Sequence, residues 1–184
     1  MSFRVSVSSM RAIAAGAAAV LGVALTTTPA AAQTQGQGGA QGNAQVGQTY
    51  GSWTGACEQM PGGGTECFIF QNVKDAQSGR PMMSLKVGYF GPNNEAAILA
   101  DLPTGVLIPP GAAFAVDGGN EVRVPYQICT PGLCRAIVPL NDQMISRMKA
   151  GSALQVSFVT AAGKKLGENA SLSGFTAGWD SVKK

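Results

Sequence analysis

Four cysteines are the residues of this 184-residue chain with the clearest potential for chemistry, and the sequence contains no histidine. Cys57 and Cys67 enclose the loop EQMPGGGTE, and Cys129 and Cys134 enclose TPGL. Cysteines at such spacings can form disulfides, act as a redox centre or bind a metal ion. Four cysteines allow three pairings.

The local pairing, Cys57 with Cys67 and Cys129 with Cys134, is favoured because both loops contain the Gly and Pro that sharp chain reversals require. On the chain-entropy model the larger loop would stabilise the fold by roughly 3 kcal/mol and the smaller by roughly 2 kcal/mol. A redox pair of the thioredoxin kind would be C-x-x-C at a helix start, and structural zinc sites space paired ligands by about two to four residues. We therefore predict two structural disulfides, without a metal or cofactor, and keep redox and metal roles as the alternatives.

Catalytic residues are not evident in the sequence. Serine and cysteine nucleophiles usually recruit a histidine as general base, and this chain has none. The ten acidic residues are scattered singly, mostly near turn signals such as those at Glu66 and Asp117, which does not suggest a catalytic pair. The stretch PGGGTEC lacks the spacing of a phosphate-binding loop. We predict that the protein is not an enzyme.

Residues 1–32 have the organisation of a secretory signal peptide. Two arginines precede the apolar run 12–25, and Ala30 and Ala32 form an A-x-A cleavage site. The apolar run is shorter than the ~20 residues of a spanning helix, which argues against a membrane anchor. Cleavage after Ala32 would release the protein into the periplasm or to the cell surface, where disulfides form.

The rest of the chain divides into a linker and one domain. Residues 33–49, QTQGQGGAQGNAQVGQT, cannot bury enough apolar surface to offset the entropy of ordering, so we predict a flexible linker. Residues 50–184 are numerous enough to bury their own core. Loss of the two signal-peptide arginines lowers the formal charge from +3 to +1. A surface so close to neutral argues against binding to nucleic acid.

Hydrophobic residues in the domain mostly follow a period of two, as in half-buried strands. The segments 112–116 and 121–128 flank Asp117-Gly118-Gly119-Asn120, where the glycines can supply the positive backbone angles of a tight hairpin. Further strands are expected at 52–57, 66–73, 82–89, 135–138, 154–158 and 164–172. Many short strands separated by Gly and Pro predict an all-β, antiparallel sandwich or barrel.

One short helix is expected at 142–150. Asn141 is a suitable N-cap, and Gly151 can adopt the left-handed conformation that ends a helix. Its apolar stripe, which should pack on the sheet, is formed by Met144, Ile145 and Met148.

Several ordered motifs of the domain resemble the invasion-associated locus B family of small exported bacterial proteins. They are the WTGAC opening at 53–57, Cys67 at the head of a strand, CTPGLCRA at 129–136, VPL at 138–140, KAG at 149–151 and SLSGFTA at 171–177. The resemblance extends from about Gly51 to the end of the chain. Two positions depart from it: Ser52 stands where an acid is common, and Trp179 where the residue is usually smaller.

The resemblance implies an immunoglobulin-like antiparallel β-sandwich in the periplasm or at the cell surface, with the two local disulfides. It brings neither settled catalytic residues nor a cofactor. Trp53 and Phe175, which lie in the shared motifs, are expected to be core aromatics rather than contact residues.

We therefore expect a non-enzymatic envelope protein that binds an envelope or host protein, in host-cell entry or envelope maintenance. Exposed candidates are the tip 61–65 and the loop 90–94, but the favoured partner surface is Leu107, Ile108, Pro109 and Pro110, where apolar residues adjoin a proline pair. A free sheet edge also leaves a homo-oligomer open. The alternatives are a carbohydrate-binding or cell-wall-acting domain, which needs a carboxylate pair and a stacking aromatic, and a thiol-disulfide partner in envelope folding.

Overall fold

A computed structural model of the chain describes residues 46–60 and 63–183. The predicted signal peptide, 1–32, and most of the predicted linker, 33–49, lie outside these residues. The described part contains, in chain order, β1 (Thr49–Tyr50), β2 (Trp53–Gln59), β3 (Thr65–Lys74), β4 (Pro81–Phe90), β5 (Glu95–Leu102), β6 (Ala112–Val116), β7 (Val122–Val124), β8 (Tyr126–Cys129), β9 (Cys134–Pro139), α1 (Asp142–Ala150), β10 (Ala153–Val159), β11 (Lys165–Ser171) and α2 (Phe175–Val182).

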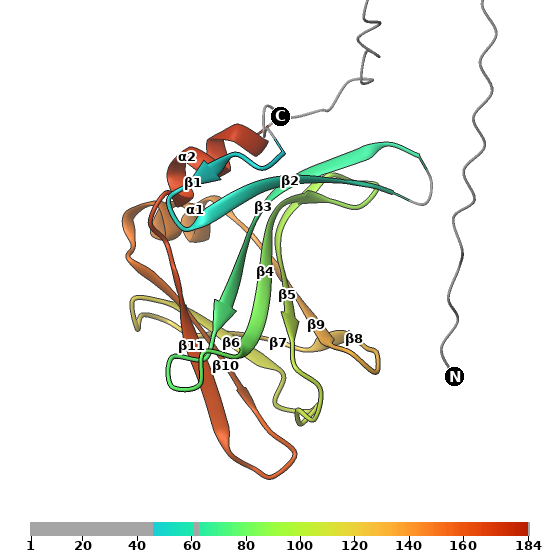
Figure 1. The fold of residues 1–184 in the computed structure, drawn as a ribbon, viewed down its shortest axis with the longest axis vertical. Helices are drawn as coiled ribbons and strands as arrows, with labels where there is room; N and C mark the ends of the chain where they lie inside the picture. The colour runs from blue at the N-terminus through green and yellow to red at the C-terminus, as the bar shows by residue number, and fades with distance from the viewer. Residues whose placement is uncertain (1–45, 61–62, 184) are drawn as a thin grey trace, which may run out of the picture. The chain divides into compact units, whose positions relative to one another are not determined.

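The strands form two antiparallel sheets that face each other across one core (Figure 1). The larger sheet has the order β1-β2-β3-β4-β5-β9-β8, and the smaller has the order β11-β10-β6-β7. Alternate residues of central strands point into the core, among them Leu85 and Ile98 from the larger sheet and Phe114 and Val156 from the smaller. This arrangement confirms the predicted antiparallel β-sandwich.

The predicted strand 121–128 is divided between the two sheets, so that prediction was wrong. Residues 122–124 pair with β6 in the smaller sheet, whereas 126–129 pair with β9 in the larger one. Pro125 lies between them and has no N–H with which to continue a ladder. The chain crosses from the smaller sheet to the larger one at Pro125. Gly111 packs closely against this crossing, because a Cβ at Gly111 would lie 2.2 Å from the carbonyl oxygen of Val124.

Strand β5 was absent from the sequence-based prediction, although it lies between β4 and β9 in the centre of the larger sheet. Its sequence, EAAILADL, has Glu95 and Asp101 on the outer face, but Ala97 and Leu99 between them are apolar, so residues 96–100 form a continuous apolar run. Such a run lacks the alternation that marks half-buried strands.

Helix α1 occupies the predicted range, and the Asn141 side chain accepts a hydrogen bond from the N–H of Met144 at 2.8 Å, as an N-cap does. Gly151 does not adopt the predicted left-handed conformation, since its φ is −85°. Glycine is required there by close packing, because a Cβ would lie 2.5 Å from Val116 Cγ1 and 2.9 Å from Asp117 Oδ2.

Helix α2 was not predicted. It follows Gly174, whose φ of 81° is left-handed, and it contains Gly178, which lowers helix propensity. Trp179 of this helix is completely buried and stacks on Tyr89, with ring centroids 5.2 Å apart. Trp53 and Phe175 are also completely buried, in an edge-to-face contact at 5.7 Å, which confirms that both are core aromatics.

One edge of the smaller sheet is closed by a side chain of the larger sheet. The Gln71 amide donates from Nε2 to the carbonyl of Ser171 and accepts on Oε1 from its N–H, both at 2.9 Å. Trp53 Nε1 donates to the same carbonyl at 3.0 Å. Gln71 therefore occupies the place of a neighbouring strand at the end of β11.

Replacing Gln71 by leucine should lower the free energy of unfolding by about 1–3 kcal/mol, because the partly buried N–H of Ser171 would lose its partner. Urea unfolding followed by circular dichroism measures the change. Gln59→Leu is the matched control, since Gln59 is exposed and its side chain is hydrogen-bonded to Thr65 alone among the described residues, so its effect should stay within about 0.5 kcal/mol. Equal effects of the two substitutions would contradict the role assigned to Gln71.

Candidate binding surfaces

The cysteines occupy directly opposed positions on paired strands. Cys57 of β2 is bonded to Cys67 of β3, and Cys129 of β8 to Cys134 of β9, with Cα atoms 4.0 and 4.1 Å apart. All four lie in the described part of the chain, and none is free. A resting dithiol or a thiolate metal site would need free thiols, so this arrangement supports the structural reading of both pairs.

The predicted partner surface forms a turn between β5 and β6. Leu107 N donates to the carbonyl of Val159 at 2.8 Å, which anchors the start of the turn, and Gly111 N donates to that of Ile108 at 3.0 Å, which closes the turn. The Leu107 and Ile108 residues are nevertheless 36% and 52% exposed, and Pro109 is exposed beside them. The turn thus presents apolar side chains to solvent from a fixed backbone.

The two other exposed candidates are less informative. Residues 61–62 of the Gly-rich tip lie outside the described range, and the adjoining Gly63 and Gly64 are exposed. The loop after Phe90 is a turn between β4 and β5, where Glu66 Oε1 accepts a hydrogen bond from Gly91 N at 2.8 Å. The described residues of these two segments do not line the polar pocket of the smaller sheet or the groove beside the hairpin of β8 and β9.

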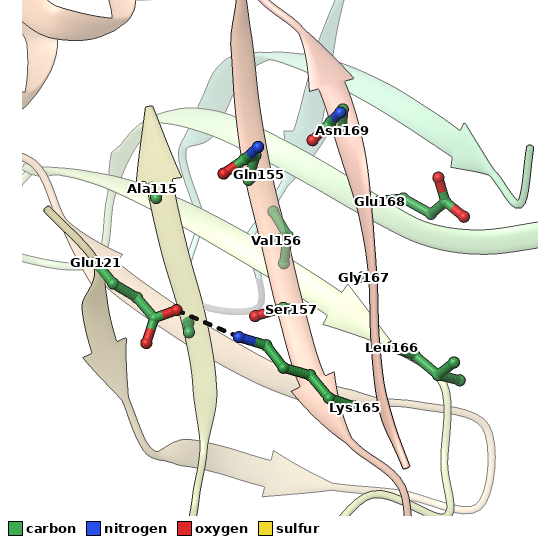
Figure 2. Close-up of a pocket in the computed structure, with 11 residues that line it drawn as sticks. Ala115, Glu121, Gln155, Val156, Ser157, Lys165, Leu166, Gly167, Glu168 and Asn169 are labelled. Atoms are coloured by element: carbon green, nitrogen blue, oxygen red, sulfur yellow. Dashed lines mark ion pairs between the residues drawn. The ribbon is translucent and has the colours of Figure 1, made fainter. Parts of the chain in front are cut away.

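A shallow polar pocket of about 300 Å³ lies on the outer face of the smaller sheet (Figure 2). Its small lining residues come from three strands, and its polar ones include the opposed pair Gln155 and Asn169. Lys165 Nζ lies 3.7 Å from Glu121 Oε2 at one side. Sequence analysis missed this pocket because only strand register brings these residues together. Aromatic side chains do not line it, which disfavours the carbohydrate-stacking alternative.

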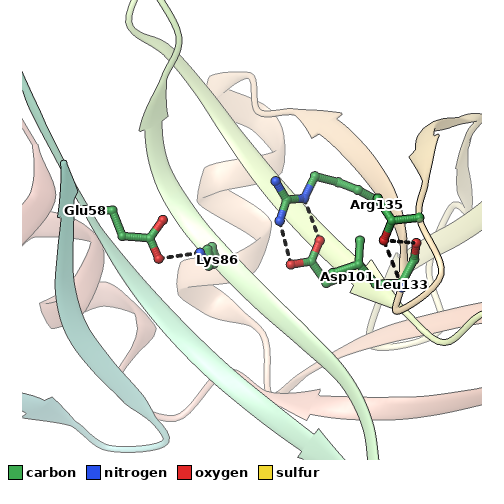
Figure 3. A network of polar contacts seen from close by, with 6 residues as sticks. Glu58, Lys86, Asp101, Leu133 and Arg135 are labelled. Atoms are coloured by element: carbon green, nitrogen blue, oxygen red, sulfur yellow. Dashed lines mark hydrogen bonds and ion pairs between the residues drawn. The ribbon is translucent and has the colours of Figure 1, made fainter. Parts of the chain in front are cut away.

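Two ion pairs lie on the outer face of the larger sheet (Figure 3). Lys86 Nζ is 2.6 Å from Glu58 Oε1 and 4.8 Å from the centre of the Phe68 ring. Arg135 donates to both carboxylate oxygens of Asp101, at 2.6 and 2.7 Å, and this hydrogen bonding raises the pKa of Arg135. Because each charge has a partner, we assign these residues to strand alignment and not to catalysis.

These features define a class: a small antiparallel β-sandwich in which a disulfide ties each of two hairpins. Among the described residues, helices long and apolar enough to cross a membrane are absent.

The chain belongs to the invasion associated locus B (IalB) protein family, whose model matches residues 53–183. The match includes all four cysteines and both helices. It is also similar to the crystal structure of invasion associated protein B from Bartonella henselae, with a TM-score of 0.60 and 21% sequence identity, over 72% of this chain and 91% of that one. No curated protein matches the chain.

Proposed function

We propose that this protein is exported to the cell envelope and acts without catalysis, by binding an envelope or host protein through the turn Leu107–Pro110. Export is supported by the charged, apolar and small-residue order of the first 32 residues and by the two disulfides. The family and the Bartonella protein are named as invasion associated, which supports a role in host-cell entry, and a role in envelope maintenance is the alternative within this proposal.

The exposed, anchored turn is the observation that carries the proposal. Leu107 and Ile108 are exposed to solvent. Burying them against a partner would stabilise the complex by about 25 cal/mol for each Å² of apolar surface removed from water. One hydrogen bond anchors the start of the turn and another closes it before a partner binds, and the preceding Val106 is buried and bridged to Thr160. Little additional ordering entropy is then lost on binding.

Photo-crosslinking in intact cells tests this surface. A photoreactive amino acid replaces Ile108 in one variant and Val46 in a control, since Val46 is 73% exposed and apolar but remote in sequence from the turn. We expect one envelope or host protein to be captured from position 108 and not from position 46. The same band should disappear when Leu107→Asp and Ile108→Asp are introduced together in a chain labelled at Pro109.

Equal capture from positions 46 and 108, or capture that survives the double substitution, would contradict binding through this turn. Circular dichroism of the double variant should match the native protein, because both side chains lie outside the core cluster.

A further inference from the structure

A second, larger groove lies where β3 and β5 end and β4 begins, beside the hairpin of β8 and β9. Its volume is about 560 Å³, within the range of ligand-binding clefts. Much of its lining is apolar, including Met82, Met83, Pro103 and Leu133. Methionine side chains adapt to varied apolar partners, so this lining suits insertion of a side chain from another molecule.

The Cys129–Cys134 disulfide explains how one wall of the groove is held. Gly132 and Leu133 line the groove and belong to the tip of the hairpin that this disulfide closes. The tip is also tied across by the N–H of Thr130, which donates to the carbonyl of Leu133 at 2.8 Å. The CTPGLC motif therefore builds a fixed wall with a half-buried leucine facing an apolar space.

Polar groups in the groove are suited to a peptide main chain. The side chains of Asn72 and Ser84 line it and make no hydrogen bond within the described part of the chain. An amide side chain both donates and accepts, as each peptide unit of a bound segment requires.

The charged residues of the groove indicate which charge a bound segment should carry. Its lining contains two charged residues, Lys74 and Asp101. Asp101 is neutralised by two hydrogen bonds from Arg135, whereas Lys74 is exposed and forms no ion pair with the described residues. A carboxylate on the ligand would complement Lys74.

We propose that this groove binds an extended segment of a partner protein in which apolar side chains adjoin an aspartate or glutamate. The apolar side chains fill the space between Met82 and Leu133, the main chain bonds to Asn72 and Ser84, and the carboxylate pairs with Lys74. This groove is separate from the turn Leu107–Pro110, so evidence against binding at one of the two surfaces would not count against binding at the other.

A displayed library of random heptapeptides is the probe for this proposal. Selection on the native protein should enrich sequences with two or more apolar residues next to Asp or Glu. Calorimetry with an enriched peptide should show a dissociation constant about threefold to tenfold higher for Lys74→Glu, and about tenfold higher for Leu133→Ser. Added salt should weaken binding to the native protein.

Lys164→Glu is the matched control, because Lys164 is exposed in the turn between β10 and β11 and does not line the groove. Its affinity for the peptide should equal that of the native protein, as should that of the Leu107→Asp, Ile108→Asp variant. Enrichment of basic or uncharged sequences would overturn the proposal. So would equal losses for Lys164→Glu and Lys74→Glu, or the same peptides selected by a folded Lys74→Glu, Leu133→Ser variant.

Discussion

Trp179→Ala should destabilise the domain by about 3–5 kcal/mol, which is the usual cost of removing a large aromatic side chain from a core. Trp179 is completely buried and stacks on both Tyr89 and Phe175, at centroid distances of 5.2 and 6.2 Å. Its removal would leave a cavity between α2 and the larger sheet. Since natural domains are stable by only about 5–15 kcal/mol, this loss would be a large part of the total.

Urea unfolding followed by far-UV circular dichroism measures this effect without relying on the lost fluorophore. Trp179→Phe is the control, because it keeps an aromatic ring in the stack. The indole N–H of Trp179 is buried without a hydrogen-bond partner in the described part of the chain, so its loss costs no hydrogen bond. We expect about 1 kcal/mol for phenylalanine. An alanine variant as stable as the native protein would show that α2 is not packed on the sheet.

Gly174→Ala should cost about 2–5 kcal/mol, because backbone strain and overpacking combine at this position. The φ of 81° imposes about 1–2 kcal/mol of strain on any residue with a Cβ. The added Cβ would also lie 2.2 Å from the carbonyl oxygen of Tyr50, so the backbone of β1 or the start of α2 must move. Such overpacking costs about 1–3 kcal/mol in addition.

Gly163→Ala separates backbone strain from overpacking. Its φ of 79° is similar, but nothing lies within 4 Å of the position that a Cβ would occupy. We expect a loss of about 1–2 kcal/mol, from strain alone. Thermal unfolding of the two variants in parallel measures the difference. If both substitutions cost the same, the close approach of Gly174 to Tyr50 would not contribute to stability.

Both large effects concern the packing of α2 against distant parts of the domain, which local sequence patterns did not reveal. The stretch FTAGWDSV contains Gly178 within the helix and has no side-chain N-cap, so its helix signal is weak. In the folded domain Gly178 allows close packing, because a Cβ there would lie only 3.0 Å from Ile69 Cδ1. Trp179, which stands where the resemblance to the family leads one to expect a smaller residue, is completely buried and is a core residue.

Features set by neighbouring residues could be predicted from the sequence. Period-two alternation located β10, where Leu154, Val156 and Phe158 are buried, and the Asn141 cap located α1 to its first residue. The Gly and Pro content of the two loops predicted the local cysteine pairing that the structure contains. Each of these signals arises within about a dozen residues, where backbone geometry and side-chain direction follow directly from residue type.

Other features depended on contacts between distant segments. The crossing at Pro125 places one alternating pattern in two different sheets, and the apolar Ala97 and Leu99 on the outer face of β5 hide its alternation. The groove combines the disulfide turn at Gly132 and Leu133 with the ends of three strands, which are far from it in sequence. Residue type alone indicated the antiparallel all-β class, the local disulfide pairing and the first helix, because these follow from local geometry, whereas the choice of a sandwich over a barrel came from the resemblance to the family. Tertiary structure alone decided the groove and the packing of α2, because they depend on which strands lie side by side.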